Sequence, residues 1–127
     1  MARPEEEFVP EAGPEEGKVS ISKDVIATIA GIAAADVKGI ASPRGGAFPK
    51  GEAARRLVET ELAEGRVRIS VKASVVYGHP VRDVAQQLQE RIKSEVEKMT
   101  ALPVDAVDVE ITRVVFPEEE GAFEGEG

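Results

Sequence analysis

The stretch RVRISVKASVVYGHPVRDVAQQLQERIKSEVEKM, residues 66–99, carries the strongest secondary-structure signal in the chain. Up to Tyr77, apolar and polar residues alternate, which is the period of a half-buried strand. After Pro80, apolar residues recur every three or four positions, which is the period of an amphipathic helix. Pro80 suits the first helical turn, and Pro103 ends the pattern. The stretch therefore predicts a strand over 66–77 and then a helix of about twenty residues.

A second predicted strand precedes this one and forms a hairpin with it. Residues 56–62 alternate in the same way, and residues 63–65 supply the turn. Glu59 and Glu61 fall on the polar face, where we expect them to form ion pairs with basic side chains of the next strand. The apolar face of that next strand carries Val67, Ile69, Val71, Ala73, Val75 and Tyr77.

The N-terminal half predicts a strand, a helix and a second short strand. Residues 18–21 alternate as a strand, and Ser22 is placed to cap a helix over about 23–35 with its hydroxyl. Residues 36–41 follow as a short extended segment. Ser42–Gly51 contains two prolines and three glycines without periodicity, which indicates a loop.

With a last strand over 107–111, the predicted element order is β-α-β-β-β-α-β. These elements indicate an α+β fold, a two-layer sandwich with two helices on one face of a small mixed sheet. The first helix is apolar nearly all round, so it needs a cover besides the sheet. Either the second helix or a protein partner supplies that cover. Gly31 within the helix indicates that a neighbour packs closely against it.

Charge divides the chain of 127 residues into a core and two tails, although the net charge of the whole is −8. Residues 1–17 hold six Glu and one Arg, and residues 118–127 hold five Glu and no base. We expect both acidic tails to be disordered, because they offer few apolar side chains to bury. The core, residues 18–117, holds 13 acidic and 15 basic side chains and suits a single α+β domain.

No stretch of the sequence predicts a membrane span or a secretory signal. The longest nearly unbroken apolar run covers residues 25–35, whereas a bilayer needs about twenty residues. The N-terminus lacks a basic segment followed by an apolar one. We therefore expect a cytoplasmic protein.

Few residues offer catalytic, cofactor-binding or metal-binding chemistry, and we expect none of these sites. The chain has no cysteine, and His79 is its one histidine. Arg44-Gly45-Gly46 is a weak phosphate-binding pattern that a loop explains better. An enzyme with a carboxylate metal site would need acidic residues to cluster in space, and we rank it last.

Basic residues on and beside the hairpin form the candidate interaction surface, which suits an anionic partner. They are Arg55, Arg56, Arg66, Arg68 and Lys72. No aromatic residue is interleaved with them, so the usual platform for base stacking is missing. Ion pairing with Glu59 and Glu61 is the simpler interpretation of these bases.

Four sequence fragments of the predicted domain, taken in order, resemble a known protein family. They are VSISKDVIATIAGIAAADVKGI (residues 19–40), residues 76–78, VAQQLQERIKSEVEKMT (residues 84–100) and residues 104–114. In this order they resemble the alkaline shock protein 23 family, small envelope-stress proteins of Gram-positive bacteria. The resemblance covers about residues 18–116, and the loop at 42–51 departs from the family's pattern.

The resemblance implies a non-enzymatic protein of the envelope stress response and of cell-envelope homeostasis. It also implies self-assembly into a homo-oligomer and, for some members, a membrane-anchored partner that carries a related domain. We therefore expect a non-catalytic cytoplasmic interaction protein, peripheral to the membrane through its partner. The alternative is a small nucleic-acid-binding domain that uses the basic hairpin face, which salt-dependent RNA or DNA binding would favour.

Overall fold

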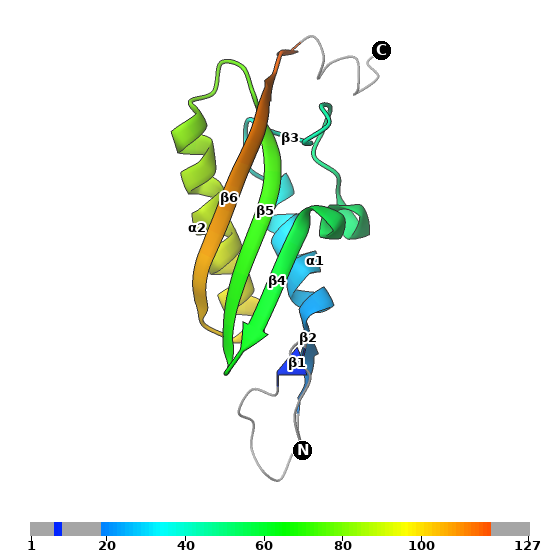
Figure 1. Cartoon of the computed structure of the whole chain (residues 1–127), viewed down its shortest axis with the longest axis vertical. Coiled ribbons are helices and arrows are strands. Elements are labelled where there is room, and N and C mark those ends of the chain that lie inside the picture. The colour runs from blue at the N-terminus through cyan, green and yellow to red at the C-terminus, as the bar shows by residue number, and fades with distance from the viewer. Residues whose placement is uncertain (1–6, 9–18, 118–127) are drawn as a thin grey trace.

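The computed structural model describes residues 7–8 and 19–117, whose arrangement is shown in Figure 1. The acidic tails predicted over 1–17 and 118–127 lie outside the described residues, apart from Glu7–Phe8. These two residues form β1, which pairs antiparallel with β2 (Ile21–Ser22). The sequence pattern does not predict β1.

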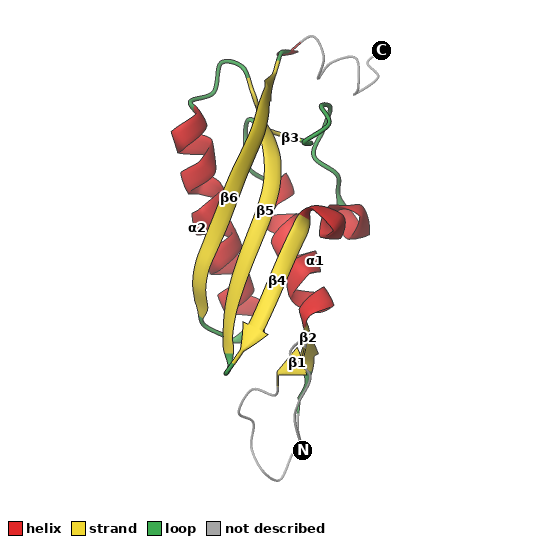
Figure 2. Ribbon diagram, viewed as in Figure 1, coloured by secondary structure: helices red, strands yellow, loops and turns green. Residues whose placement is uncertain are grey.

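Helices and strands follow one another along the rest of the chain. The elements are α1 (Lys23–Ala35), β3 (Ile40–Ala41), the 3₁₀-helix η2 (Gly51–Leu57), β4 (Val58–Ala63), β5 (Arg66–Val76), α2 (Val81–Thr100) and β6 (Val104–Val115). Both α-helices lie on one face of the sheet formed by β3 to β6 (Figure 2). The structure confirms the α+β two-layer fold and, apart from β1 and η2, the predicted element order.

Strand β5 is the centre of the sheet. Strand β4 pairs antiparallel with residues 66–71 of β5, and β3 continues the same edge at residues 74–75. Strand β6 pairs with the other edge of β5 in parallel. The sheet is therefore mixed, as predicted. Among the described strands, β4 and β6 each pair on one side only.

A two-residue turn sets the register of the β4–β5 hairpin. Ala63 lies opposite Arg66, and the intervening Glu64 and Gly65 have φ angles of 54° and 77°. Positive φ at both positions matches the right-handed twist of the two strands. This register turns Val58, Thr60 and Leu62 toward the helices, and it leaves Glu59 and Glu61 exposed on the opposite face.

Helix α2 connects β5 to its parallel neighbour β6 and packs against both. One buried stripe of α2, which includes Leu88, Ile92 and Val96, faces the core at helical spacing. The Gln89 side chain donates a hydrogen bond of 3.0 Å to the carbonyl of Val107 in β6. At the C-terminal end of α2, the Glu97 carboxylate accepts a hydrogen bond of 2.9 Å from the N–H of Val104. Helix and strand are thus fixed in register.

Close packing between α1 and η2 explains the glycine in the middle of α1. A Cβ built on Gly31 would lie 2.6 Å from the Cβ of Ala54, a fully buried residue of η2. A mid-helix glycine costs about 1 kcal/mol relative to alanine, and this close approach offsets the cost. The prediction that a neighbour packs against Gly31 is confirmed.

Two local predictions near this contact are wrong. The strand predicted from residue 56 begins at Val58, because residues 51–57 form η2. The run GEAARRL is rich in helix-forming residues, and its Ala54 packs against α1, so helical structure is favoured there over a strand. Ser22 is the N-cap residue of α1, as predicted, but its side chain makes no capping hydrogen bond.

Tyr77 is also placed differently from the prediction. The alternating pattern predicts Tyr77 on the apolar face of the strand, but β5 ends at Val76 and Tyr77 is 63% exposed. Gly78 follows with a φ of 107°, which turns the chain toward α2. The Tyr77 ring lies beside the ring of Phe116, with the centroids 5.5 Å apart.

Candidate functional site

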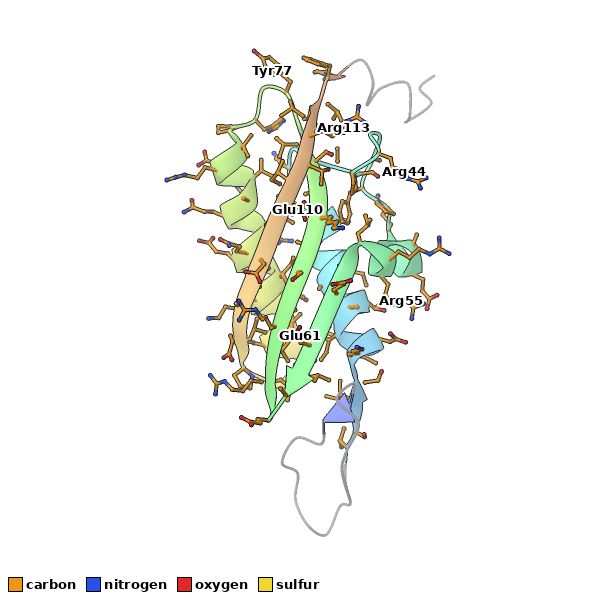
Figure 3. All side chains as sticks on the ribbon, in the orientation of Figure 1. Arg44, Arg55, Glu61, Tyr77, Glu110 and Arg113 are labelled. Atoms are coloured by element: carbon orange, nitrogen blue, oxygen red, sulfur yellow. The ribbon has the colours of Figure 1, made fainter. Side chains whose placement is uncertain are left out.

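The face of the sheet opposite the helices, called the open face below, carries charged side chains from three strands and η2. It comprises Arg56, Glu59, Glu61, Arg66, Arg68, Ser70, Lys72, Asp105, Asp108 and Glu110. Figure 3 shows Glu61 and Glu110 near its two edges. The bases on the strands belong to β5, and the acids belong to β4 and β6. The open face thus holds five carboxylates and four basic side chains.

Carboxylates of β6 hold the arginines of β5. Arg66 Nη2 lies 2.7 Å from Asp105 Oδ1, and Arg66 Nε lies 2.9 Å from both carboxylate oxygens. The hydrogen bond from Arg66 holds the pKa of Asp105 below its ordinary value, and Asp105 raises the pKa of Arg66. Arg68 pairs with Asp108 at 3.4 Å, and Lys72 lies opposite Glu110 in register.

The arginines expected to pair with Glu59 and Glu61 therefore pair with aspartates of β6 instead. Glu61 lies opposite Arg68 in register, yet Arg68 pairs with Asp108 across the other edge of β5. Within residues 19–117, neither Glu59 nor Glu61 belongs to an ion pair. These two glutamates are exposed on the open face, and Glu110 of β6 likewise belongs to no ion pair within these residues.

The structure separates the five predicted interaction residues into two places. Arg66, Arg68 and Lys72 share the open face, and Arg56 lines a shallow hollow of about 340 Å³ with Lys72. Arg55 lies elsewhere, between η2 and α1, where its guanidinium pairs with Asp24 at 3.1 Å. The bases on the open face stand among carboxylates and do not form a continuous basic patch.

Helix α1 leaves one apolar stripe uncovered by the sheet, α2 and η2. Val25 is 46% exposed, Ile32 is 50% exposed, and Ile29 between them is half-buried. Spacings of four and three residues place these side chains, called the outer stripe below, on one side of the helix. The opposite side of α1, with Ile26, Ala30 and Ala34, belongs to the core.

Helix α2 supplies part of the cover that the sequence requires for α1. The two helices pack side by side, and Asp36 at the end of α1 pairs with Arg91 of α2 at 3.0 Å. The sequence left open whether a second helix or a partner covers α1. The structure shows the second helix in place and the outer stripe still exposed.

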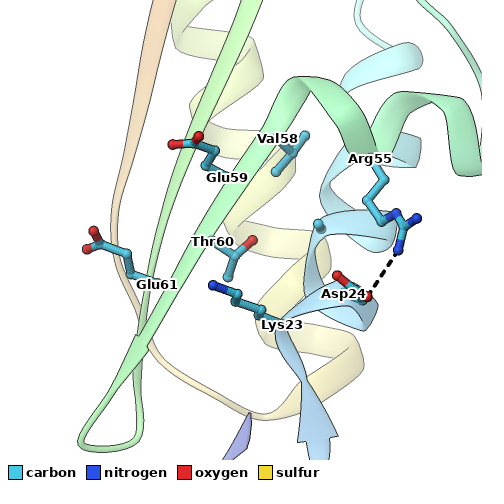
Figure 4. A pocket seen from close by; sticks show the side chains of 8 residues that line it. Lys23, Asp24, Arg55, Val58, Glu59, Thr60 and Glu61 are labelled. Carbon is cyan, nitrogen blue, oxygen red and sulfur yellow. Dashed lines mark ion pairs between the residues drawn. The ribbon is translucent and has the colours of Figure 1, made fainter. Parts of the chain in front are cut away.

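A groove of about 470 Å³ lies between the free edge of β4 and the start of α1 (Figure 4). Its lining residues are Lys23, Asp24, Ala27, Arg55 and residues 58–61. The hydroxyl of Thr60 is buried there and has no hydrogen-bond partner among the residues that the structure describes. Sequence reasoning missed this groove, because no local pattern shows that α1 begins beside β4.

The described part of the chain gathers no recognisable reaction centre. In residues 7–8 and 19–117, no three His, Cys, Asp or Glu side chains are grouped as metal ligands would be. His79 is exposed in the turn before α2, and its ring lies against Gly39, where an added Cβ would approach its Cγ to 2.7 Å. The hollows on the surface are lined mainly by charged side chains and by the sheet edge.

Fold and surface together define a small α+β domain with a charged open face and an exposed apolar helix stripe. Comparison with known proteins identifies its family. The chain belongs to the alkaline shock protein 23 family, described as having a cell envelope-related function, whose model matches residues 11–116. The family resemblance of the sequence is thereby confirmed.

Relatives of the chain come from Gram-positive bacteria. It is 35% identical over 107 residues to YqhY of Bacillus subtilis (strain 168), a protein described as uncharacterized, and the match covers 79% of this chain and 78% of the relative. It is 27% identical over 103 residues to Spy1535 of Streptococcus pyogenes serotype M6, also described as uncharacterized, with 78% and 80% covered. No solved structure matches the chain significantly. No helix within the described residues is long and apolar enough to cross a bilayer.

Proposed function

We propose that this chain is a non-catalytic interaction protein of the cell envelope, which assembles with copies of itself and docks to a membrane-anchored partner carrying a related domain. The family's cell envelope-related function supports the setting. The outer stripe and the charged open face are surfaces suited to binding, which supports the role of an interaction protein. The resemblance to envelope-stress proteins implies both self-assembly and the anchored partner.

The outer stripe is the observation that carries this proposal. Val25 and Ile32 are each about half exposed, although they sit on a helix whose other sides are packed. A helix that exposes apolar side chains on a small domain gains free energy when a second surface covers them. A related domain would present a corresponding helix, so one stripe suits both a second copy and the anchored partner.

Simple energetics predict that a single stripe contact is weak. Burying the exposed halves of Val25 and Ile32 on two copies contributes about 3–6 kcal/mol. Association costs about 4–15 kcal/mol in lost translational and rotational freedom. Assembly through the stripe therefore depends on protein concentration and gains from several contacts at once, as in an array or at a membrane surface.

The nucleic-acid alternative has less support from the geometry. Arg66 and Arg68 are held by Asp105 and Asp108, and carboxylates outnumber bases on the open face. A polyanion would need to displace these pairs and approach uncompensated glutamates. Tyr77 and Phe116, which form the ring pair at one end of the sheet, lie away from the bases of the hairpin.

Light scattering of the full chain tests self-assembly. We expect the mass to rise above 13.5 kDa with concentration, and the Val25→Ser/Ile32→Ser variant to stay monomeric at the same concentrations. Met99→Ser is the matched control, because Met99 is 60% exposed on α2 outside the stripe, and it should assemble like the unchanged chain. An unchanged chain that stays monomeric, or a stripe variant that assembles normally, would contradict the proposal.

A further inference from the structure

The free edge of β4 presents unused hydrogen-bonding groups to the groove beside α1. In a hairpin with a two-residue turn, the pair that closes the turn is hydrogen-bonded and the pairs then alternate. Ala63, Glu61 and Glu59 therefore bond to β5, whereas Val58, Thr60 and Leu62 point their N–H and C=O groups away from it. The N–H of Val58 bonds to the carbonyl of Arg55, which agrees with this alternation.

Thr60 is the centre of this edge. Thr60 is 7% exposed, and its buried hydroxyl has no hydrogen-bond partner within residues 7–8 and 19–117. A buried hydroxyl without a hydrogen bond costs about 1–3 kcal/mol, so such groups normally have a partner. Figure 4 shows Thr60 at the strand edge with Lys23 and Asp24 at the start of α1 across the groove. A polypeptide strand in the groove would bring polar backbone groups to this position.

The acidic side chains of β4 select the occupant, because the basic side chains of the groove, Lys23 and Arg55, lie across from β4 on α1 and η2. A strand added beside β4 would have alternate side chains next to Glu59 and Glu61, which form no ion pair within residues 19–117. Basic side chains two residues apart would pair with them. The residue between would face Thr60 and the small Ala27, so a small polar side chain fits. Two β4 strands paired about a twofold axis would place glutamates opposite glutamates, which disfavours self-pairing here.

We propose that the groove binds an extended basic segment of a partner protein, which adds to the sheet as a strand beside β4 and places two basic side chains opposite Glu59 and Glu61. This inference rests on the proposed function as an interaction protein and names the chemistry of one partner. The main-chain hydrogen bonds supply affinity, and the two glutamates supply selectivity. No residue of the outer stripe lines the groove, so substitutions can test the two surfaces separately.

A short peptide tests the proposal directly. The probe is acetyl-Val-Lys-Ser-Lys-Val-amide, whose palindromic sequence gives the same side-chain pairs in either strand direction. We expect it to shift the amide NMR signals of Thr60 and Leu62 in the full chain. The same peptide with both lysines replaced by glutamate should not bind. The same peptide with N-methyl groups on its serine and on the lysine that follows should not bind either, because these groups block the main-chain bonds to Thr60 in either strand direction. Equal shifts with all three peptides would overturn the proposal.

Protein variants separate edge binding from general charge attraction. Glu59→Lys/Glu61→Lys should weaken binding of the lysine probe about tenfold, because two attractions become repulsions. Asp83→Lys/Glu90→Lys makes the same charge change on the exposed side of α2 and should leave affinity within about twofold. Equal losses in both variants would show nonspecific attraction and overturn the proposal.

The Thr60 hydroxyl has its own control. Thr60→Val removes a group that has no partner in the unbound protein, so the unfolding midpoint should not fall. We expect weaker binding of the lysine probe, and unchanged binding would remove Thr60 from the site.

Two other outcomes would assign the groove to a different occupant. Shifts of the groove's NMR signals on dilution of the protein alone would assign the groove to a second copy of this chain. Probe binding that needs removal of residues 1–17 would assign it to that segment of the chain.

Failure of this inference and failure of the proposed self-assembly are distinguishable. Val25→Ser/Ile32→Ser alters the outer stripe and should bind the lysine probe like the unchanged chain. A protein that assembles through the stripe but ignores the probe would overturn the groove alone. A monomeric protein that binds the probe would overturn self-assembly alone.

Discussion

Arg66 and Asp105 illustrate how a single contact defines the open face. The sequence pattern places Arg66 on the polar side of its strand, and this placement is correct. Its partner could not be predicted, because Asp105 lies 39 residues away and on a strand that joins the sheet in parallel. Local patterns give the side of a strand on which a residue lies, whereas the identity of the neighbouring strand depends on the whole chain.

Replacing Arg66 should raise the pKa of Asp105. The hydrogen bond from Arg66 is the largest cause that lowers this pKa from its ordinary value of 3.8, so Arg66→Gln should move it upward. NMR titration of the side-chain carboxyl measures the shift. Arg91→Gln is the control, since Arg91 pairs with Asp36 and should leave Asp105 unchanged. An Asp105 pKa that does not respond to Arg66→Gln would contradict the assigned cause.

The same pair has a defined pH dependence. Because the pKa of Asp105 is lowered on folding, its contribution to stability is present above the ordinary value of 3.8. The contribution disappears as the pH falls through the lower pKa of the folded protein. The exposed position of the pair makes the effect small and sensitive to salt.

The elements differ in how much of them the sequence predicts. Helix α2 and the β4–β5 hairpin follow from long periodic patterns, and both formed where expected within a few residues. Residues 51–57 lack such a pattern, and η2 forms there because Ala54 packs against Gly31 of a distant helix. The Ser22 side chain makes no cap at α1, although its residue type suits one. Tertiary contacts therefore determine the local structure of these short segments.

Gly31→Ala tests the contact between α1 and η2. The added methyl would lie 2.6 Å from Ala54 Cβ, and overpacking of this kind costs about 1–3 kcal/mol. Alanine has a better helix propensity than glycine by up to about 1 kcal/mol, which offsets part of this cost. We therefore expect the free energy of unfolding to fall by about 1 kcal/mol. Denaturant unfolding measures it.

A compensating substitution identifies the cause of that loss. Adding Ala54→Gly removes the overlapping methyl but itself costs about 1 kcal/mol in helix propensity, so the double variant should lose less stability than the sum of the two single variants. Ser94→Ala on the exposed side of α2 is a control for a surface change in a helix and should not destabilise the protein. A stabilising Gly31→Ala, or losses that simply add in the double variant, would contradict the packing account.

At the scale of the whole molecule, the parallel placement of β6 changes the meaning of the hairpin bases. From the sequence they form a basic surface for an anionic partner. In the structure, carboxylates of β6 lie beside them and pair with Arg66 and Arg68, so within residues 19–117 Glu59, Glu61 and Glu110 are the open-face acids without an ion pair. The exposed outer stripe of α1 could be anticipated from its apolar composition. The groove beside β4 could not, because it exists only where two distant elements meet.

Site-specific photo-crosslinking tests most directly the claim that this domain acts by binding proteins through α1. A benzophenone amino acid replaces Ile32 in the outer stripe, or Gln86 on the exposed side of α2 as a control, in the full chain expressed in a Gram-positive host. We expect position 32 to crosslink to another copy of this chain or to a membrane protein with a related domain, and position 86 to give no such product. Crosslinks to RNA, or equal products at both positions, would contradict it.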